Sequence, residues 1–334
     1  MGEYRLEAVD EYSHQPTADT NFNESVYVNG WDIKQKVGLW SRIGNRINEG
    51  HAETSICIYL PDGRVACQFL RPEISSNEKH AAAGLEYSVL EPFKSVAMKY
   101  SGDVMILDDP QVLRTPKVMF NSAPRVPCRF ELTSRGLSPM NGGEPTDPGA
   151  ETMYGRDFSL GHFNQHTRTV GQIMVGDQTW DLDGHGWRDH SWGPRYWTNI
   201  YFYRLFIANF GDDRGLMMLK RVDREGVTHR RGVLMFDNQY EQIVDMDVFT
   251  EWDENKDPAA VQLGIRTAKR KVRMKGKIRT VAPLRNHREI NGKRLESRIS
   301  EAFTEWTWDD GRPGIGITEY IEFIEDGEPA GYPL

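Results

Sequence analysis

The strongest constraint on the fold is a two-residue alternation of apolar and charged side chains. It is clearest at residues 269–280, where Val272, Met274 and Ile278 fall on one side and lysines and arginines on the other. Such alternation is typical of a β-strand with one buried and one solvated face. Lysines on such a face also protect a sheet edge from aggregation, so we assign this charge to solvation and not to anion binding.

Further strand-length segments follow one another along the chain, with few helical patterns between them. Turn sequences separate several of them, for example PDG at 61–63 and DDG at 309–311. Short helices are predicted at 75–85 and 108–118. Many short strands at regular spacing favour an all-β barrel or sandwich over βαβ units. The other predicted strands are 54–60, 64–70, 86–92, 94–107, 127–133, 168–176, 200–210, 215–222, 231–236, 242–252, 298–308 and 315–324.

Chain length indicates more than one domain. At roughly 150 residues per domain, 334 residues suggest two. The stretch 134–155 is rich in Gly, Pro, Ser and acidic residues and has no periodicity, so it is the best linker or long loop. A division between residues 150 and 200 would give two β domains of comparable size.

Composition excludes several classes of partner. Forty-one Lys and Arg against 49 Asp and Glu give a net charge of −8, which does not suit a nucleic-acid-binding surface. No stretch approaches the roughly 18 apolar residues of a membrane span, and the N-terminus resembles no secretory signal. The three cysteines form no CxxC pair, which removes zinc ribbons and disulfide scaffolds. We therefore expect a cytoplasmic protein, and its oligomeric state stays open.

Polar and aromatic residues are densest at 180–197, WDLDGHGWRDHSWGPRYW, which holds four of the nine tryptophans. Asp189, His190 and Ser191 do not form a catalytic triad here, because adjacent residues of an extended segment point to opposite faces. His162 and His166 share one strand face and are predicted to line a pocket. No HxH pair, HExxH sequence or tight carboxylate spacing is present, so we predict no metal and no other cofactor.

We interpret this stretch as an acid–base pair in an aromatic pocket. Asp189, with a raised pKa, would donate a proton, and His190 or His185 would position water or remove a proton. Arg188 and Arg195 would hold the carboxyl group or bind a substrate oxygen. Trp187, Trp192, Trp197 and Tyr196 would bind an apolar skeleton and stabilise a developing carbocation. In the alternative interpretation, Arg188 and Asp189 form a buried structural ion pair and the tryptophans are core residues.

The run Gly184–Arg195, GHGWRDHSWGPR, resembles the G-x-G-x-R-D-H-S-W-G-x-R signature of the hydroxyneurosporene synthase (carotenoid 1,2-hydratase)/AttH-like family. Weaker matches cover most of the chain. They are NEGHAE at 48–53 with LPDGR at 60–64, Gln165 with GQIMV at 171–175, and GIGITEY at 314–320. The fungal lipocalin-like Diels–Alderases are more distant relatives of that family.

The resemblance implies a fold and a type of chemistry. Family members consist of two lipocalin-like antiparallel β-barrel domains packed side by side, with the signature near their junction, so we place the domains at 1–195 and 196–334. Carotenoid hydratases of the family protonate an isoprenoid double bond and add water without a cofactor. Through the matched motif Asp189, His190 and Trp192 carry over, and Tyr203 is added by proximity.

These observations leave three functions open. The first is a cofactor-independent lyase or isomerase (a hydratase, dehydratase or cyclase) acting on an apolar terpenoid, steroid or similar alicyclic substrate. The second is a non-catalytic lipocalin-like carrier of a hydrophobic small molecule, since aromatic pockets also serve for binding alone. The third is a pericyclase like the Diels–Alderases, which would not need Asp189 as an acid.

Overall fold

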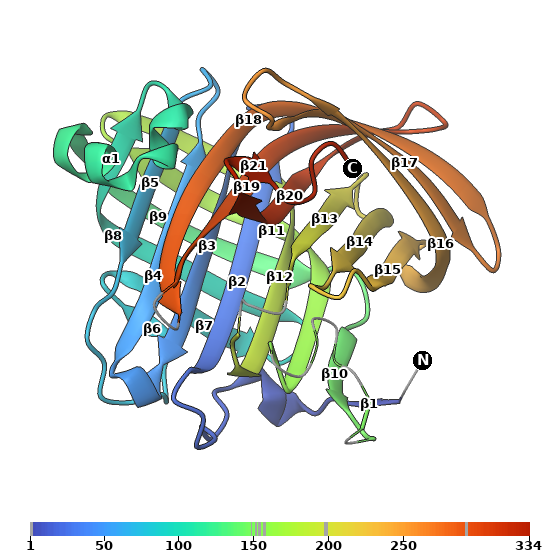
Figure 1. Cartoon of the computed structure of the whole chain (residues 1–334), viewed down its shortest axis with the longest axis horizontal. Helices are drawn as coiled ribbons and strands as arrows, with labels where there is room; N and C mark the ends of the chain where they lie inside the picture. Colours follow the sequence, from blue (N-terminus) through green and yellow to red (C-terminus); the bar gives the residue numbers. More distant parts are fainter. Residues whose placement is uncertain are drawn as a thin grey trace. The chain divides into compact units, whose positions relative to one another are not determined.

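Contacts within the chain divide it into two compact units (Figure 1). The computed structural model describes residues 3–147, 149–150, 152, 155, 158–196, 200–290 and 293–334. Unit 1 comprises Met1–Ile58, Ala66–Ile106 and Arg125–Trp197, and unit 2 comprises Tyr59–Val65, Leu107–Pro124 and Thr198–Leu334. Two short segments from the N-terminal half of the sequence therefore belong to the same unit as the C-terminal residues.

The all-β prediction is confirmed, since the described residues form two antiparallel sheets and one α-helix. The first sheet closes on itself as a ring in the order β11-β12-β2-β3-β4-β5-β8-β9, because β9 pairs with both β8 and β11. Its strands are β1 (Tyr4–Arg5), β2 (Phe22–Asp32), β3 (Val37–Arg46), β4 (His51–Tyr59), β5 (Val65–Leu70), β6 (Ala81–Ala82), β7 (Leu85–Glu91), β8 (Ser95–Leu107), β9 (Arg125–Gly136), β10 (Asn141–Pro145), β11 (Gly161–Val175) and β12 (Gln178–Pro194).

The second sheet is a meander that also closes as a ring, because its first strand β13 pairs with β20. Its strands are β13 (Phe202–Asn209), β14 (Arg214–Val222), β15 (Thr228–Phe236), β16 (Gln239–Trp252), β17 (Pro258–Thr267), β18 (Lys271–Ile290), β19 (Lys293–Trp308), β20 (Pro313–Glu325) and β21 (Glu328–Pro329). Unit 2 also contains the 3-10 helix η3 (Pro110–Arg114) and the α-helix α1 (Pro116–Ser122). Two more 3-10 helices, η1 (Ala8–Glu11) and η2 (Ile47–Glu49), lie in unit 1.

Both rings bury apolar side chains together with polar ones. In unit 2 a large apolar cluster that includes Phe206, Met218 and Trp306 forms the core. In unit 1 many buried side chains are polar or charged, among them Glu24 and Arg188, which are 0% and 2% exposed. Because a buried polar group is costly unless it is hydrogen-bonded, these groups are expected to be paired with one another. The partners of these buried polar side chains are therefore the first question about the interior of unit 1.

Strand predictions held where one strand face is solvated. The alternating segment 269–280 lies in β18, and the turns at 61–63 and 309–311 connect β4 to β5 and β19 to β20. The predicted helix at 108–118 corresponds to η3 and the start of α1. The helix predicted at 75–85 is wrong: the segment consists of bends, the short strand β6 and the turn into β7. The backbone carbonyl groups of Lys79 and His80 accept hydrogen bonds from Asn45 and Tyr87, which holds this segment against the sheet.

Among the described residues, no helix has the length and apolar character needed to cross a membrane. The three cysteines are buried free thiols, as expected for core residues, and burial raises the pKa of both Cys67 and Cys128 to about 12.

Candidate functional site

Strand β12 carries half of the predicted site residues, and it lies between β11 and β2 (Figure 1). Arg188 of β12 donates a hydrogen bond to the hydroxyl group of Tyr87 on β7, a strand that is not its neighbour in the sheet. Within the ring, Ser41 of β3 contacts Met98 of β8, and because these two ring strands are not neighbours, the contact runs through the interior. Ser41 stands opposite Val28, and Val28 stands opposite Arg188, so all three share one face and Arg188 points inward. Side chains alternate along a strand, and therefore Trp187, Asp189 and Ser191 point outward.

The outward side contains the closest contact between two predicted site residues. Oδ2 of Asp189 lies 3.7 Å from Nε2 of His162 on β11. The His162 side chain is 2% exposed and that of Asp189 is 20% exposed, so one partner is buried and the other reaches solvent. Tyr27 of β2 and Asn164 of β11 stand opposite Asp189 in register and point to the same side. The carboxyl group thus lies among groups that can exchange protons or hydrogen bonds.

Aromatic side chains flank this pair. Trp187 is buried and packs edge-on against His166, with ring centroids 4.6 Å apart. Tyr27 stacks with Trp40 of β3 at 6.1 Å, and Trp40 belongs to the same side of the sheet through its pairing with β2. We call this outward set the Asp189 face, and it consists of Tyr27, Trp40, His162, Asn164, His166, Trp187, Asp189 and Ser191.

Arg195 supplies positive charge next to the Asp189 face. Its guanidinium donates a 2.7 Å hydrogen bond to Oγ of Ser191 and lies over the ring of Phe158 at 4.3 Å. Burial, together with the charge of Arg42, lowers the pKa of Arg195 to about 9, and Asp189 opposes this shift. Arg195 therefore remains charged at neutral pH.

An ion-paired carboxylate on β4 gives a prediction about acid stability. Glu53 lies 3.2 Å from Arg42 and 3.5 Å from Arg71. Burial alone would raise the pKa of Glu53, but Arg42, Arg46 and Arg71 lower it to about 2 from 4.5. A carboxyl group whose pKa is lower in the folded than in the unfolded chain contributes its full stabilisation at pH values above the unfolded-chain pKa. The contribution of Glu53 to the free energy of unfolding is therefore lost as pH falls from 4.5 towards 2.

We expect Glu53→Gln to be less stable than the wild type at neutral pH by about 3 kcal/mol, since one pKa unit corresponds to about 1.4 kcal/mol. Denaturant unfolding followed from pH 7 downward measures the difference between the two proteins. This difference in the free energy of unfolding should be constant at pH values above the pKa that Glu53 has in the unfolded chain. It should become smaller as pH falls below that value. A difference that does not change with pH would show that Glu53 is not the titrating group.

His185 is separated from this pair although it points to the same side. Four residues of strand, about 13 Å, lie between it and Asp189. His185 stands opposite Arg168 of β11 and Trp31 of β2. The structure therefore brings Asp189 together with His162 and not with His185.

Arg188 is part of a buried ion pair inside the ring, but its partner is not Asp189. Its two terminal nitrogens donate hydrogen bonds of 2.8 and 2.7 Å to the carboxylate of Glu11, and its Nε donates to Gln165 at 2.9 Å. Burial would lower the pKa of Arg188, but Tyr87 and Glu11 raise it overall. The structural ion pair considered from the sequence thus exists in another form, with Glu11 of the N-terminal segment in place of Asp189.

His190 also points inward, away from Asp189. Its Nε2 contacts Oε1 of Glu24, and Nδ1 of His14 lies 3.1 Å from the same oxygen. Burial would raise the pKa of Glu24, but hydrogen bonds from the two histidines lower it to about 2. Trp192 stacks on His14 with ring centroids 3.8 Å apart, and a side chain at Gly161 would collide with its indole. Thus Asp189 and His190, although adjacent in sequence, belong to two different clusters.

The other predicted residues lie away from both clusters or outside the described residues. Tyr196 is exposed, and Trp197 lies outside the described residues. Tyr203 belongs to unit 2, where its hydroxyl donates a hydrogen bond to Glu319. Tyr203 and Glu319 are both buried, on the opposite side of their sheet from the Phe206 core.

Sequence reasoning missed several residues that complete the two clusters. Tyr27 and Glu24 lie on β2, which was not predicted as a strand, and His14 was assigned no role. The available signal was the run Ser25–Val28, SVYV, whose β-branched and aromatic residues favour a strand. Contacts such as that between Glu11 and Arg188, 177 residues apart, have no local sequence signal.

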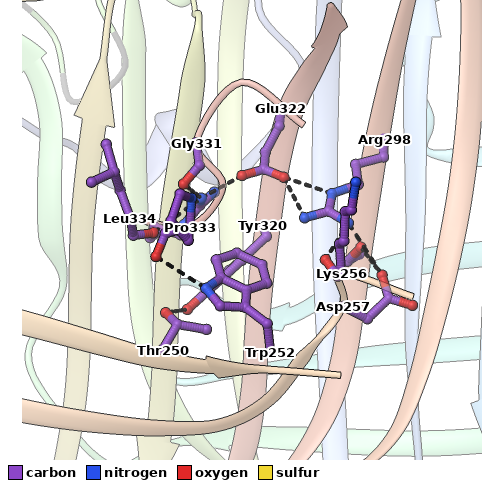
Figure 2. A network of polar contacts seen from close by, with 12 residues as sticks. Thr250, Trp252, Lys256, Asp257, Arg298, Tyr320, Glu322, Gly331, Pro333 and Leu334 are labelled. Atoms are coloured by element: carbon purple, nitrogen blue, oxygen red, sulfur yellow. Dashed lines mark hydrogen bonds and ion pairs between the residues drawn. The ribbon is translucent and has the colours of Figure 1, made fainter. Parts of the chain in front are cut away.

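Unit 2 contains a buried charge network at one end of its core. Glu322 accepts a 2.6 Å hydrogen bond from Nε of Arg298, and its other oxygen contacts Arg204. Arg298 also donates to the carbonyl group of Lys256 and approaches Asp257 at 3.4 Å, as Figure 2 shows. All four charged side chains are at most 1% exposed. The two carboxylates compensate the charges of the two buried arginines. Because these charged groups contact one another, we interpret the network as structural.

Comparison with solved structures confirms the fold that the sequence resemblance implies. A Nitrosomonas europaea protein given the name AttH superposes with a TM-score of 0.65 at 13% identity, covering 96% of this chain and 97% of that one. Kievitone hydratase from Nectria haematococca gives a TM-score of 0.59 at 10% identity, covering 95% and 93%. CghA, crystallised with Sch210972, gives 0.54 at 13% identity, covering 93% and 89%. At these identities the similarity is one of fold.

Two further comparisons bear on the sequence. Residues 7–324 match the profile of a family described as Domain of unknown function (DUF7064). Among curated proteins, none matches this chain.

Proposed function

The chain belongs to the DUF7064 family, and we propose from its Asp189 face that it is a lyase or isomerase working by acid–base chemistry. The proposed substrate is an apolar molecule of terpenoid, steroid or similar alicyclic type that carries a double bond or a tertiary alcohol. The observation that carries this proposal is the 3.7 Å approach of the partly exposed Asp189 carboxyl group to the buried His162 ring. At 3.7 Å the two groups do not form a direct hydrogen bond, but one water molecule can bridge them, and a carboxyl group and an imidazole so placed form a donor and an acceptor for proton transfer.

In the proposed hydration, the carboxyl group of Asp189 donates its proton to a carbon of the double bond. A new C–H bond forms, and the neighbouring carbon becomes a carbocation. Water attacks that carbon, and the proton that the bound water loses passes to the Asp189 carboxylate, either directly or through His162, which restores the starting state. Dehydration of a tertiary alcohol follows the same steps in reverse.

The surroundings of Asp189 suit a cationic intermediate. Electron-rich faces of Trp187, Trp40 and Tyr27 attract positive charge, by about 0.5–2 kcal/mol for each well-placed ring. The Tyr27 hydroxyl and the Asn164 amide, which stand opposite Asp189, provide hydrogen bonds to a water molecule or a substrate hydroxyl group. Asn164 is itself oriented by a 2.9 Å hydrogen bond that its Oδ1 accepts from Asn141.

The fold similarity supports this type of reaction without specifying the substrate. One neighbour of the same fold is by name a hydratase, and another was crystallised with the small molecule Sch210972. Function depends on the site and not on the fold, so the proposal depends on the Asp189 face.

The experiment that tests the proposal is incubation of the full chain with unsaturated terpenoids and steroids in water enriched in oxygen-18, followed by mass spectrometry. A product that has gained one labelled water, or a dehydrated or isomerised product whose formation needs Asp189, would support it. Recovery of intact ligand in stoichiometric amount would identify a carrier instead. A cyclised product formed equally well by Asp189→Asn would identify a pericyclase and contradict the proposal.

A further inference from the structure

The interior of the unit 1 ring contains a second cluster that the proposed reaction does not use. His14, Glu24 and His190 each offer one ligand atom, and these atoms lie within 4.8 Å of one another. We propose that this cluster binds one divalent transition-metal ion of the zinc type. The site is separate from the Asp189 face, because His190 and Asp189 are adjacent on β12 and point to opposite sides.

The three donor atoms converge on one point. Nδ1 of His14 is 3.1 Å from Oε1 of Glu24, and Nε2 of His190 contacts that same oxygen. Ligands at about 2.0–2.1 Å from a tetrahedral ion are about 3.3–3.4 Å from one another. The observed spacing therefore requires only a small outward movement of the His190 ring to admit an ion.

The outer contact of His14 matches that of a metal-bound histidine. Nε2 of His14, the nitrogen that faces away from Glu24, lies 3.3 Å from Oδ1 of Asp10. A carboxylate on the far nitrogen fixes the tautomer of a ligating histidine and raises its basicity. The second oxygen of Glu24 accepts the backbone N–H of His14 at 3.1 Å, which orients the first oxygen towards the histidines. Trp192, stacked on His14, holds the ring in place.

A third imidazole lies beside the cluster. The His80 ring is 5.4 Å from that of His190, nearly perpendicular to it, and the residue is 6% exposed. Its Nε2 has no hydrogen-bond partner among the described residues, which is unusual for a buried polar atom. Three protein ligands leave at least one position open on a tetrahedral ion, and His80 is the nearest further donor. This unpartnered nitrogen is a second, independent indication that the cluster is built for a ligand.

The ligand set indicates the class of ion. Two imidazoles and one carboxylate suit zinc, cobalt or nickel, whereas magnesium and calcium prefer sites made only of oxygen. Imidazoles that bind a metal ion do so in their neutral form, so Glu24 would supply a negative charge that the cation neutralises. Because His14 precedes β2 in the sequence, the ion would connect the N-terminal segment to β2 and β12.

The test uses the full chain, freed of metal with a chelator and then titrated with zinc by calorimetry and with cobalt by visible absorption. We expect one ion per chain, a cobalt spectrum typical of nitrogen and oxygen ligands, and a higher Tm with zinc than without it. His14→Gln should lose most of the affinity, and Asp10→Asn should weaken binding by about 10–100-fold. His51→Gln, which alters a partly exposed histidine outside the cluster, is the matched control and should bind as the wild type does.

Two results would overturn the proposal. One is the absence of stoichiometric binding of either ion by the wild type. The other is equal binding by His14→Gln and His51→Gln, provided that circular dichroism shows both to be folded. Neither result would bear on the function proposed for the Asp189 face, because that function is tested by measuring turnover.

Discussion

Asp189→Asn should reduce kcat by about 10²–10⁴-fold while the Kd for substrate changes little. The two side chains have the same size and both accept hydrogen bonds, but an amide cannot act as the proton donor. In the proposed function the apolar part of the substrate would contact Trp187, Trp40 and Tyr27, which the substitution leaves in place. Turnover is measured by product formation, and binding by quenching of tryptophan fluorescence.

Asp183→Asn is the matched control for this substitution. Asp183 lies on the same strand and points to the same side, but its side chain is 65% exposed and pairs with Arg168 at 2.6 Å. We expect its kcat to equal that of the wild type. Full activity of Asp189→Asn, or an equal loss in both variants, would show that Asp189 is not the acid.

Glu322→Gln should destabilise unit 2 by about 3–5 kcal/mol, the typical cost of removing one partner from a buried ion pair. Glu322 is the carboxylate shared by Arg204 and Arg298, and both guanidiniums are buried. Burial lowers the pKa of Arg298, and Glu322 and Asp257 oppose that shift. Without the Glu322 charge, two positive groups would remain close together in the interior with less compensation.

The matched control is Glu325→Gln, three residues further along β20. The Glu325 side chain is 49% exposed and lies 3.7 Å from Arg224, so its loss should cost about 0–1 kcal/mol. Urea denaturation of both variants measures the free energy of unfolding. Equal stability of Glu322→Gln and Glu325→Gln would mean that the buried arginines do not depend on Glu322.

Strand locations were predictable from the sequence wherever one face of a strand meets solvent. β18 alternates between Val272 or Met274, which are buried, and exposed lysines, and the pattern is visible directly. β2 is buried on nearly every residue, so both of its faces carry apolar or small polar groups and no alternation appears. The same reason explains why β3 was not predicted, since nine of its ten residues are buried.

The candidate site was predictable in part. The position of Asp189 and its separation from His190 follow from the alternation of side chains along a strand, whereas the identity of its neighbour does not. His162 meets Asp189 because β11 and β12 pair in a register that depends on their whole length. Had the register been shifted by one residue, every side chain would have changed faces.

A search for local metal motifs in the sequence does not detect the cluster that we propose as a metal site. His14, Glu24 and His190 come from the N-terminal segment, β2 and β12, and Glu24 and His190 are 166 residues apart. Local motifs such as HExxH detect ligands that share one helix, but they cannot detect ligands that a closed sheet brings together.

The most direct test of the central claim, that Asp189 and His162 act together in proton transfer, is a double-mutant cycle on kcat. The four proteins are the wild type, Asp189→Asn, His162→Gln and the double variant, and all are assayed with the substrate identified by oxygen-18 labelling. If the two groups act as one unit, the double variant should be no slower than Asp189→Asn alone. Losses that multiply in the double variant would show that the two residues act independently and would contradict the account.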